Sequence, residues 1–364
     1  MSDTPTLIHL ISSNKWGGSQ RYAFDICDYY HSQGWNVVAV TRDAKVVDDR
    51  FRSRGIELLH APLRGFFDPA SALMLARRLR RIPRDKGLVH VHRYRDAFTV
   101  LLAKRIANRP DIRVISTRHK VCRGRNSWLF RRIYDKINAH IFVSRTAFDH
   151  FRRSWPDKLP MRESTVHILL NSVNIPVSIP EVEPDRGPVF AIYPGPVVKD
   201  KGIEWIIDAL ASLRGLKIRL RIAGNANPDY ADSLRRRAMA RNVMEMIDWR
   251  TGAANIESLI SQSHFAVLPS VEREGFGLPN ICVMAAGRPQ ICTTSGAQSE
   301  YLSDGETALF VPPADANALA VAMRQLATDP HLRADIGAKA FEQYSSHLSW
   351  QSFIPKLTEI YRNA

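Results

Sequence analysis

A glycine-rich loop that contains one acid stands out in the second half of this chain. It reads Glu274-Gly275-Phe276-Gly277-Leu278-Pro279 and lies between a short apolar run and a helix expected over residues 281–286. The first N–H groups of a helix have no internal partner and carry the positive end of the helix dipole. A strand, a glycine loop and a helix start therefore form an anion site that a phosphate can approach closely. A carboxylate at its rim, Glu274, is suited to bind sugar hydroxyls.

A second candidate phosphate contact follows another expected strand, in the run from Gly195 to Gly202. Lys201 stands beside a glycine at the start of a helix expected over 201–213. A lysine that opens a helix adds its charge to the helix dipole, which predicts Lys201 as a contact to a pyrophosphate. Gly195 and Lys199 lie in the same loop. The alternative reading is a pair of ordinary surface lysines.

The loop at Glu274 and the pair Lys201-Gly202 resemble the donor-site motifs of the retaining glycosyltransferases of the GT-B fold, in glycosyltransferase family 4. The resemblance implies that Glu274 holds a hydroxyl of the donor sugar. It also implies that Lys201 and the N–H groups of Gly277 and Leu278 stabilise the leaving diphosphate. No metal is then required, and the chain has no Asp-x-Asp metal motif.

Two positions depart from the family pattern. Pro196 replaces an arginine of the loop that contains Lys201, so one of two phosphate-neutralising cations is missing. Lys199 or Arg250 could take its place. Cys282 replaces the second glutamate of the motif, which in the family contacts the nucleotide ribose. These departures leave Glu274 in place.

The resemblance implies further site residues in both halves of the chain. Gly17-Gly18 corresponds to a glycine pair that lies under the donor phosphates or beside the acceptor, and the alternative is an ordinary turn. His119 corresponds to a histidine near the donor sugar, and the alternative is a structural histidine. The other implied contacts on the donor side are Gly195, Lys199, Gly224, Arg250, Phe276, Cys282 and Glu300.

Two histidines two residues apart, His90 and His92, point to one face of an expected strand over 88–92. Such a pair could chelate a metal. No third ligand or carboxylate stands near them in the sequence, which argues against a metal site. We expect both in the wall of a cleft or in the core.

The elements that must position these residues alternate between strands and helices, which predicts parallel sheets. We expect an α/β protein with two Rossmann-like, doubly wound domains that face each other across a cleft. Residues 1–175 form the acceptor-side domain, 176–188 a proline-rich linker and 189–345 the donor domain. The resemblance implies that 346–364 form a helix that crosses back to the first domain. Ser144 and Asp315 should cap helices that begin next to them. The expected strands are 7–11, 35–41, 56–59, 88–92, 114–117, 139–143, 166–170, 189–193, 216–222, 244–249 and 265–268.

Composition agrees with a globular two-domain protein. The chain has 364 residues, of which 45% are hydrophobic and 24% charged, and no apolar run is long enough to span a bilayer. Its start carries no basic region and reads as a buried strand rather than a signal peptide. The four scattered cysteines lack metal-type spacing, which predicts reduced thiols in the cytoplasm.

The net charge of +15 points to anionic partners, and the alternative is a solvated basic surface. Basic residues flank Trp128-Leu129-Phe130, a pattern that fits an anionic membrane surface, here the inner face of the cell membrane. The alternative is that these aromatic residues begin a core helix. Nucleic acid is not expected, because the chain has no aromatic RNA-binding signature.

These observations predict a glycosyltransferase, and the resemblance implies that it retains configuration and needs no cofactor. It would move a sugar from a nucleoside diphosphate donor to a glycan or lipid-linked acceptor, as in the synthesis of bacterial surface polysaccharide or lipopolysaccharide. The first alternative is a degenerate protein of the same fold that binds sugar nucleotides or acts as a scaffold with little turnover. An epimerase or a phosphorylase of the same architecture is a further alternative, although epimerases lack this loop and phosphorylases are much longer and need a pyridoxal lysine.

Overall fold

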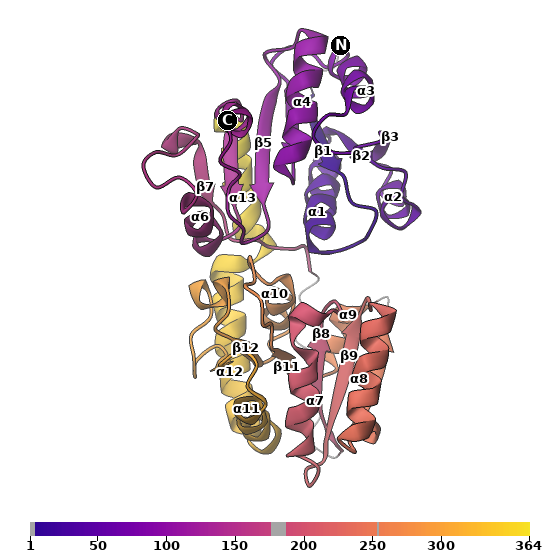
Figure 1. The fold of residues 1–364 in the computed structure, drawn as a ribbon, viewed down its shortest axis with the longest axis vertical. Helices are drawn as coiled ribbons and strands as arrows, with labels where there is room; N and C mark the ends of the chain where they lie inside the picture. The colour runs from indigo at the N-terminus through magenta and orange to yellow at the C-terminus, as the bar shows by residue number, and fades with distance from the viewer. Residues whose placement is uncertain (1–3, 176–186, 253–254) are drawn as a thin grey trace. The chain divides into compact units, whose positions relative to one another are not determined.

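The computed structural model describes residues 4–175, 187–252 and 255–364. Contacts divide the chain into two compact units (Figure 1). Met1–Val173 and Phe353–Ala364 form the N-terminal unit, and Asn174–Ser352 forms the C-terminal unit. Of the linker expected over 176–188, residues 176–186 lie outside the described residues.

The N-terminal unit is built on a parallel sheet of seven strands in the order β3-β2-β1-β4-β5-β6-β7. Every strand pair in it is parallel, so each strand must be reached by a crossover. The strands are β1 (Thr6–Ile11), β2 (Asn36–Thr41), β3 (Glu57–His60), β4 (Gly87–Val91), β5 (Arg113–Arg118), β6 (Ala139–Phe142) and β7 (Val166–Ile168).

The C-terminal unit repeats this arrangement with six parallel strands in the order β10-β9-β8-β11-β12-β13. Both sheets therefore have the Rossmann-like strand order, as the alternation of elements predicted. The strands are β8 (Val189–Pro194), β9 (Ile218–Gly224), β10 (Ile247–Thr251), β11 (Phe265–Leu268), β12 (Gln290–Thr293) and β13 (Leu309–Val311).

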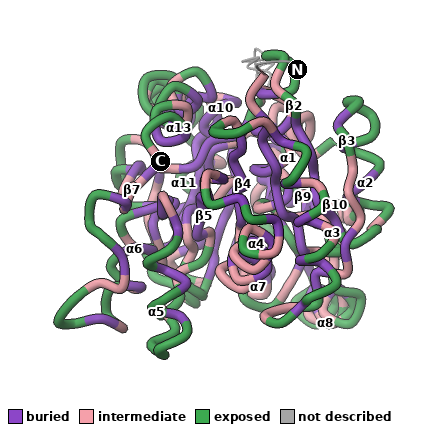
Figure 2. The backbone as a smooth tube through the Cα atoms, turned by 90° about the horizontal axis from the view of Figure 1, so that it is seen from above, coloured by how far each residue is buried: buried purple, intermediate pink, exposed green. Residues whose placement is uncertain are grey.

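Helices cover both sheets, and the strands between them are mostly buried, as the purple tube at β4, β5 and β9 shows in Figure 2. Burial of both faces of a parallel sheet explains why its strands read as short apolar runs without alternation. The α-helices are α1 (Gly18–Ser32), α2 (Lys45–Arg52), α3 (Pro69–Leu79), α4 (Tyr94–Ala107), α5 (Trp128–Asp135), α6 (Arg145–Arg152), α7 (Ile203–Ala211), α8 (Pro228–Ala240), α9 (Ile256–Ser261), α10 (Leu278–Ala285), α11 (Ala316–Thr328), α12 (Pro330–Gln343) and α13 (Trp350–Asn363).

The last helix, α13, contributes most of its length to the N-terminal unit. The Tyr30 hydroxyl lies 2.7 Å from Thr358 Oγ1, and the Tyr361 hydroxyl lies 2.6 Å from His90 Nδ1. Arg113 donates to the carbonyl of Tyr361 over 2.7 Å. These polar contacts, together with the buried Tyr361 ring, hold the end of the chain against the central strands of the first sheet.

Several element boundaries differ from the sequence prediction. Helices α4 and α10 each begin three residues earlier than expected, because a glycine or an extended residue in the preceding loop supplies the N-cap. The strand expected over 244–249 is a 3-10 turn followed by β10. Lys201 does not open a helix: it ends a 3-10 turn, Lys199–Lys201, and α7 begins only after Gly202, whose φ of +68° breaks the helical path.

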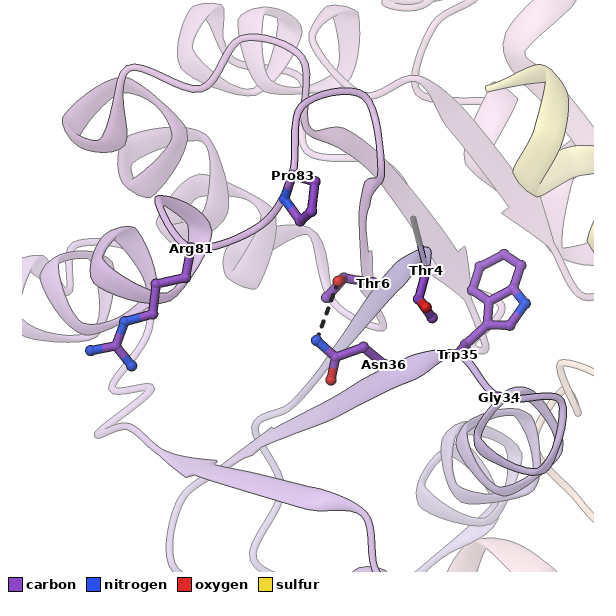
Figure 3. Close-up of a pocket in the computed structure, with 7 residues that line it drawn as sticks. All are labelled: Thr4, Thr6, Gly34, Trp35, Asn36, Arg81 and Pro83. Carbon is purple, nitrogen blue, oxygen red and sulfur yellow. Dashed lines mark hydrogen bonds between the residues drawn. The ribbon is translucent and has the colours of Figure 1, made fainter. Parts of the chain in front are cut away.

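Two further features concern surfaces. No helix in the described ranges is long and apolar enough to cross a membrane. The shallow pocket of Figure 3 is lined by Thr6, Trp35 and Asn36 among others, and Asn36 donates to Thr6 Oγ1 over 3.3 Å. Thr6 and Asn36 begin β1 and β2, so this pocket lies at the amino-terminal edge of the first sheet. Ligands of such sheets bind at the opposite, carboxyl edge.

Candidate functional site

The strand order of the C-terminal sheet reverses between β8 and β11. From β8 the chain continues to β9 on one side, and from β11 it continues to β12 on the other. The crevice outside the carboxyl ends of two such strands is where open α/β sheets bind ligands. The loop after β8 contains Lys201, and the loop after β11 contains Glu274. The topology therefore brings together two residues that are far apart in the sequence.

Lys201 and Glu274 contact each other directly. Lys201 Nζ donates to Glu274 Oε1 as part of an ion pair, and the Ser270 hydroxyl donates to the same oxygen over 2.6 Å. The Lys201 side chain is 25% exposed and that of Glu274 is 21% exposed, so a ligand can reach both. Glu274 Oε2 accepts no hydrogen bond from any residue that the structure describes. An ion pair this accessible contributes about 1 kcal/mol or less, which a bound diphosphate can displace.

The loop after β12 holds the Glu274 loop in place. The Ala297 amide donates to the Glu274 carbonyl over 3.1 Å. Thr293 and Ser295 donate to the Ser270 carbonyl over 2.6 and 2.9 Å. A Cβ on Gly296 would lie 2.5 Å from the Glu274 amide nitrogen and 2.6 Å from its carbonyl oxygen. Only glycine allows this approach, so Gly296 sets the position of the Glu274 backbone.

We predict that Gly296→Ala weakens sugar-nucleotide binding and turnover by roughly tenfold to a hundredfold, because the added methyl group must displace the Glu274 backbone. The unfolding free energy should fall by only about 1–3 kcal/mol, as expected for local overpacking. Calorimetric titration and denaturant unfolding measure the two effects. Gly215→Ala is the matched control, because a Cβ there meets no atom within 4 Å. Equal affinities for the two variants would contradict the assigned role of Gly296.

Helix α10 begins at the glycine loop. Gly277 is its N-cap with φ +91°, and a Cβ there would lie 2.3 Å from Asn280 Oδ1. Within the described ranges, the N–H groups of Gly277 and Leu278 donate to no acceptor, and Pro279 has no N–H to offer. Two backbone donors at a helix start are thus available to an anion.

Phe276 serves this loop through packing. Its side chain is 3% exposed, its ring centroid lies 4.9 Å from that of Tyr301, and the Tyr301 hydroxyl donates to its carbonyl. The side chain therefore anchors the loop and does not form its rim. Cys282 lies in the second turn of α10 and is half-buried. Glu300 is half-buried at the end of the 3-10 turn that follows Gly296.

Gly195 and Gly224 bring the loops after β8 and β9 into contact. A Cβ on Gly224, whose φ is +145°, would lie 2.0 Å from the Gly195 carbonyl oxygen. The Gly195 amide donates to the Ala223 carbonyl over 2.9 Å. These glycines shape the backbone beside Lys201. Lys199 is exposed in the same turn as Lys201.

Arg250 lies on a different strand from those that precede Lys201 and Glu274. It lies in β10, which β9 separates from β8. Its Nε donates to both oxygens of Asp248 over 2.8 and 3.0 Å, and its side chain is 56% exposed. Its ion pair with Asp248 is partly exposed, and the replacement by Arg250 of the cation missing at Pro196 stays a prediction. Lys199 is the nearer candidate in the sequence.

The predicted residues of the N-terminal unit lie at the carboxyl edge of its own sheet. Gly17 is the N-cap of α1, and its φ of −167° is an extended conformation that any residue adopts. Gly18 is the first residue of α1, so the helix starts two residues before the expected position. His119 directly follows β5, and its Nε2 lies 3.1 Å from His92 Nδ1.

Two further histidines that are distant in the sequence, His9 and His119, stand beside His90 and His92. Their ring nitrogens, however, form a line of hydrogen bonds and do not converge on one point. Among the described residues, one other group could approach metal geometry: Asp43, Asp48 and His60. His60 turns Nε2 to Asp48 at 2.9 Å and Nδ1 to Asp43 at 3.8 Å. Each nitrogen of His60 thus faces a different carboxylate, an arrangement that needs no metal ion to explain it.

His9 is the functional candidate that the sequence did not reveal. It lies in an ordinary buried strand, and only the parallel register of β1 and β4 places it opposite His90. The pattern His-x-His on the neighbouring strand was visible in the sequence. A histidine on a neighbouring strand that is far away in the sequence gives no local signal.

Models of known protein families match both halves of the chain. The model of the family Glycosyl transferases group 1 matches residues 175–343, and that of Glycosyltransferase Family 4 matches residues 16–175. Alpha-D-kanosaminyltransferase of Streptomyces kanamyceticus is 26% identical over 328 residues, which are 82% of this chain and 83% of that protein.

Two solved structures are similar over nearly the whole chain. A glycosyltransferase from Rickettsia africae ESF-5 has a TM-score of 0.84 at 18% identity and covers 99% of this chain and 98% of its own. HepE of Anabaena in complex with UDP and glucose has a TM-score of 0.83 at 15% identity and covers 99% of this chain and 100% of its own. At these identities the likeness shows the shared fold.

Proposed function

The chain belongs to the GT-B glycosyltransferases of the family 4 type, and from this premise we propose that it transfers a sugar from a nucleoside diphosphate donor with retention of configuration. One observation carries the proposal. A lysine, a carboxylate and the unpaired amides of a helix start lie together at the point where the strand order of the C-terminal sheet reverses. These are the groups that a sugar diphosphate requires.

The opposite charges of Lys201 and Glu274 predict which part of the donor each residue binds. Breaking the bond between sugar and diphosphate places negative charge on the leaving diphosphate. Lys201 and the amides of Gly277 and Leu278 stabilise that charge, and fixed donors of this kind lower the barrier because they need no reorganisation. Glu274 repels phosphate and binds a sugar hydroxyl with Oε2, while Ser270 keeps its Oε1 in place. His119 of the N-terminal unit acts on the donor sugar.

A nucleotide-binding experiment tests the proposal. HepE was solved with UDP, which makes uridine the first base to test. UDP, GDP, ADP and TDP should be compared by thermal shift and calorimetry, each with and without EDTA, because no metal takes part in the proposed step. We predict that one of them raises the melting temperature and that Lys201→Ala weakens its binding about tenfold or more.

The exposed Lys217, in the same unit, provides the matched control Lys217→Ala. Loss of affinity in both variants alike, or no binding of any nucleotide, would refute the proposal. Binding without transfer to any acceptor would instead favour the scaffold alternative, which the substitutions at Pro196 and Cys282 motivate.

The acceptor is proposed to carry negative charge, as an anionic glycan of the bacterial surface does. Arg42 follows β2, and Arg93 and Arg95 follow β4, all at the carboxyl edge of the first sheet. Burial, followed by the charges of Arg95 and Arg42, lowers the pKa of Arg93. The nearby acid, Asp96, is buried, lies 3.6 Å from Arg95 Nε and accepts from the Ser12 hydroxyl over 2.6 Å, so one carboxylate stands against three arginines. Like charges gathered in this way are stabilised by an anionic ligand.

We also place the protein in the cytoplasm at the inner face of the membrane. Trp128 is 67% exposed and Leu129 is 39% exposed at the start of α5, whereas Phe130 is buried. Phe130 therefore belongs to the core, whereas the exposure of Trp128 and Leu129 supports the membrane proposal. Arg132 lies over the Trp128 ring at 4.8 Å, and Arg125 lies over Phe130 at 5.4 Å. An exposed apolar tip with cations beside it fits the headgroup region of an anionic bilayer.

We predict that the double variant Trp128→Ser, Leu129→Ser binds phosphatidylglycerol vesicles at least about fivefold more weakly than the parent protein, because it loses the apolar part of the contact. Co-flotation at low salt measures binding. Val321→Ser in α11 is the control, since Val321 is an equally exposed apolar side chain (60%) of the other unit. Vesicle binding that is absent in the parent protein would refute the membrane proposal and leave the transferase proposal intact.

A further inference from the structure

Three histidines of the N-terminal unit form a continuous hydrogen-bonded chain. His9 lies in β1, His92 directly follows β4, and His119 directly follows β5. These three strands are neighbours in the sheet, and the register pairs His9 with His90, so that His9 and His92 share a face. His9 Nδ1 lies 3.0 Å from His92 Nε2, and His92 Nδ1 lies 3.1 Å from His119 Nε2.

All three rings are neutral at physiological pH. Burial lowers the pKa of His9 and that of His119 to about 3. Burial also lowers the pKa of His92 well below its ordinary value, and the neighbouring histidines and Arg93 lower it further. A neutral imidazole has one N–H donor and one nitrogen lone pair.

The tautomers of the three rings are therefore coupled. A hydrogen bond between two imidazoles needs the N–H of one and the lone pair of the other. His92 uses both of its nitrogens, so its tautomer fixes those of His9 and His119. Only two arrangements of the three rings satisfy both hydrogen bonds. The three N–H groups point either towards His9 or towards His119.

The two arrangements differ in what they leave at the ends. His9 Nε2 is buried and has no hydrogen-bond partner among the residues that the structure describes. If the N–H groups point towards His9, this nitrogen is a buried N–H without an acceptor. If they point towards His119, it is only an unused lone pair. Orphaned buried N–H groups are the rarer and costlier case in proteins, so the second arrangement is favoured.

The favoured arrangement determines which ring nitrogen of His119 carries the proton. His119 keeps some exposed surface, and its Nδ1 has no partner in the described part of the chain. We propose that His9 and His92 are positioning residues that fix His119 as its Nδ1–H tautomer, so that His119 meets an oxygen of the donor sugar as a neutral hydrogen-bond donor. His119 then cannot act as the base of the reaction, because its lone pair is engaged by His92. The identity of the ligand rests on the proposed function; the tautomer does not.

The tautomer can be read without any substrate. Nitrogen-15 NMR of uniformly labelled protein distinguishes protonated from unprotonated ring nitrogens. We expect His119 and His92 to be protonated at Nδ1, although free histidine favours Nε2–H. Assignment uses the variant His119→Gln. An Nε2–H tautomer at His119 in the parent protein overturns the inference at once, and this measurement does not depend on the folding of any variant.

Two substitutions at His92 separate positioning from packing. An asparagine amide can still donate to His119 Nε2, whereas a leucine of similar bulk cannot. In His92→Leu, His119 should revert to the Nε2–H form that free histidine prefers. Its KM for the donor should rise about threefold to tenfold, and His92→Asn should restore both the tautomer and KM. If both variants lose activity equally while the His119 tautomer stays unchanged, the role of His92 is structural and the inference fails.

The outcomes also separate this inference from the proposed function. If no sugar nucleotide binds but His119 is the Nδ1–H tautomer, the proposed function is refuted and the coupling of the three histidine tautomers is confirmed. If a sugar nucleotide binds and is transferred while His119 is the Nε2–H tautomer, the transferase stands and the coupled chain is refuted.

Discussion

Glu274→Gln should reduce sugar transfer by roughly a hundredfold or more while leaving nucleotide affinity intact. Loss of one fixed charge that acts in the transition state typically costs about 3–4 kcal/mol of barrier, which is a factor of 10² to 10³. The amide has the same volume and can still accept from the Ser270 hydroxyl, so the loop should keep its position. Initial rates of transfer and calorimetry with the nucleoside diphosphate measure the two quantities.

The affinity should in fact rise slightly. Glu274 competes with a diphosphate for Lys201 Nζ, because the two side chains form an ion pair in the absence of donor. Removing the carboxylate frees Lys201, and a pair worth about 1 kcal/mol corresponds to a gain of up to about fivefold. Lys201→Gln should behave differently, since it removes the phosphate contact and lowers both affinity and rate.

Glu272→Gln is the matched control. Glu272 is an exposed acid of the same loop, two residues before Glu274. Its substitution should change neither rate nor affinity by more than about twofold. A Glu274→Gln variant that transferred sugar at the parent rate, or that lost nucleotide binding as strongly as Lys201→Gln, would contradict the division of roles between the two residues.

How far the sequence predicts this molecule depends on the range of the interaction concerned. Local patterns sufficed for the doubly wound architecture, because buried parallel strands appear as short apolar runs between helices. Helix caps were equally local: Ser144 accepts from the Ala147 amide, and Asp315 accepts from the Ala318 amide, as expected. Helix starts in glycine loops were misplaced because glycine does not specify where the helical path begins.

Contacts between distant segments could not be predicted from local patterns. Lys201 and Glu274 were each predicted to lie in the site. Their direct pairing, however, depends on β8 and β11 being neighbours in the sheet. The role of Gly296 is visible only as the space that a Cβ would need beside Glu274. His9 joins the site region through strand register, which the sequence of β1 alone does not contain.

The same buried histidines should make the protein unusually sensitive to acid. Six histidines of the N-terminal unit have a pKa lowered mainly by burial: His167 is one of them, and the pKa falls to about 3 for His9, His119 and His140. The pKa values of His90 and His92 also lie well below the ordinary value. In the unfolded chain, histidine titrates near pH 6.5. Between that pH and about 3, the unfolded state therefore binds more protons than the folded state.

This difference in bound protons determines in which direction the pH changes the folding stability. Because the folded pKa values are depressed, stability is fully present above about pH 6.5 and falls as the pH decreases. Each histidine contributes a slope of up to about 1.4 kcal/mol per pH unit, so the five whose pKa is about 3 or well below the ordinary value together contribute up to about 7. A domain with about 5–15 kcal/mol of stability would lose it within about one to two pH units below 6.5. We expect the N-terminal unit to unfold between about pH 4.5 and 6.

Urea unfolding at several pH values between 7.5 and 5 measures this slope, and backbone NMR signals of β1, β4 and β5 report on the N-terminal unit alone. His140 donates or accepts at both ring nitrogens within the core, 3.0 Å from the Tyr134 carbonyl and 3.2 Å from the Ser116 hydroxyl. His140→Gln removes one titrating group, so the slope should fall by about one proton even if the variant is less stable overall. The exposed His347 of the C-terminal unit gives the control His347→Gln, which should leave the slope unchanged. A parent slope below about one proton would mean that the histidines are hydrated and titrate normally in the folded state, and the neutral chain from His9 to His119 would lose its physical basis.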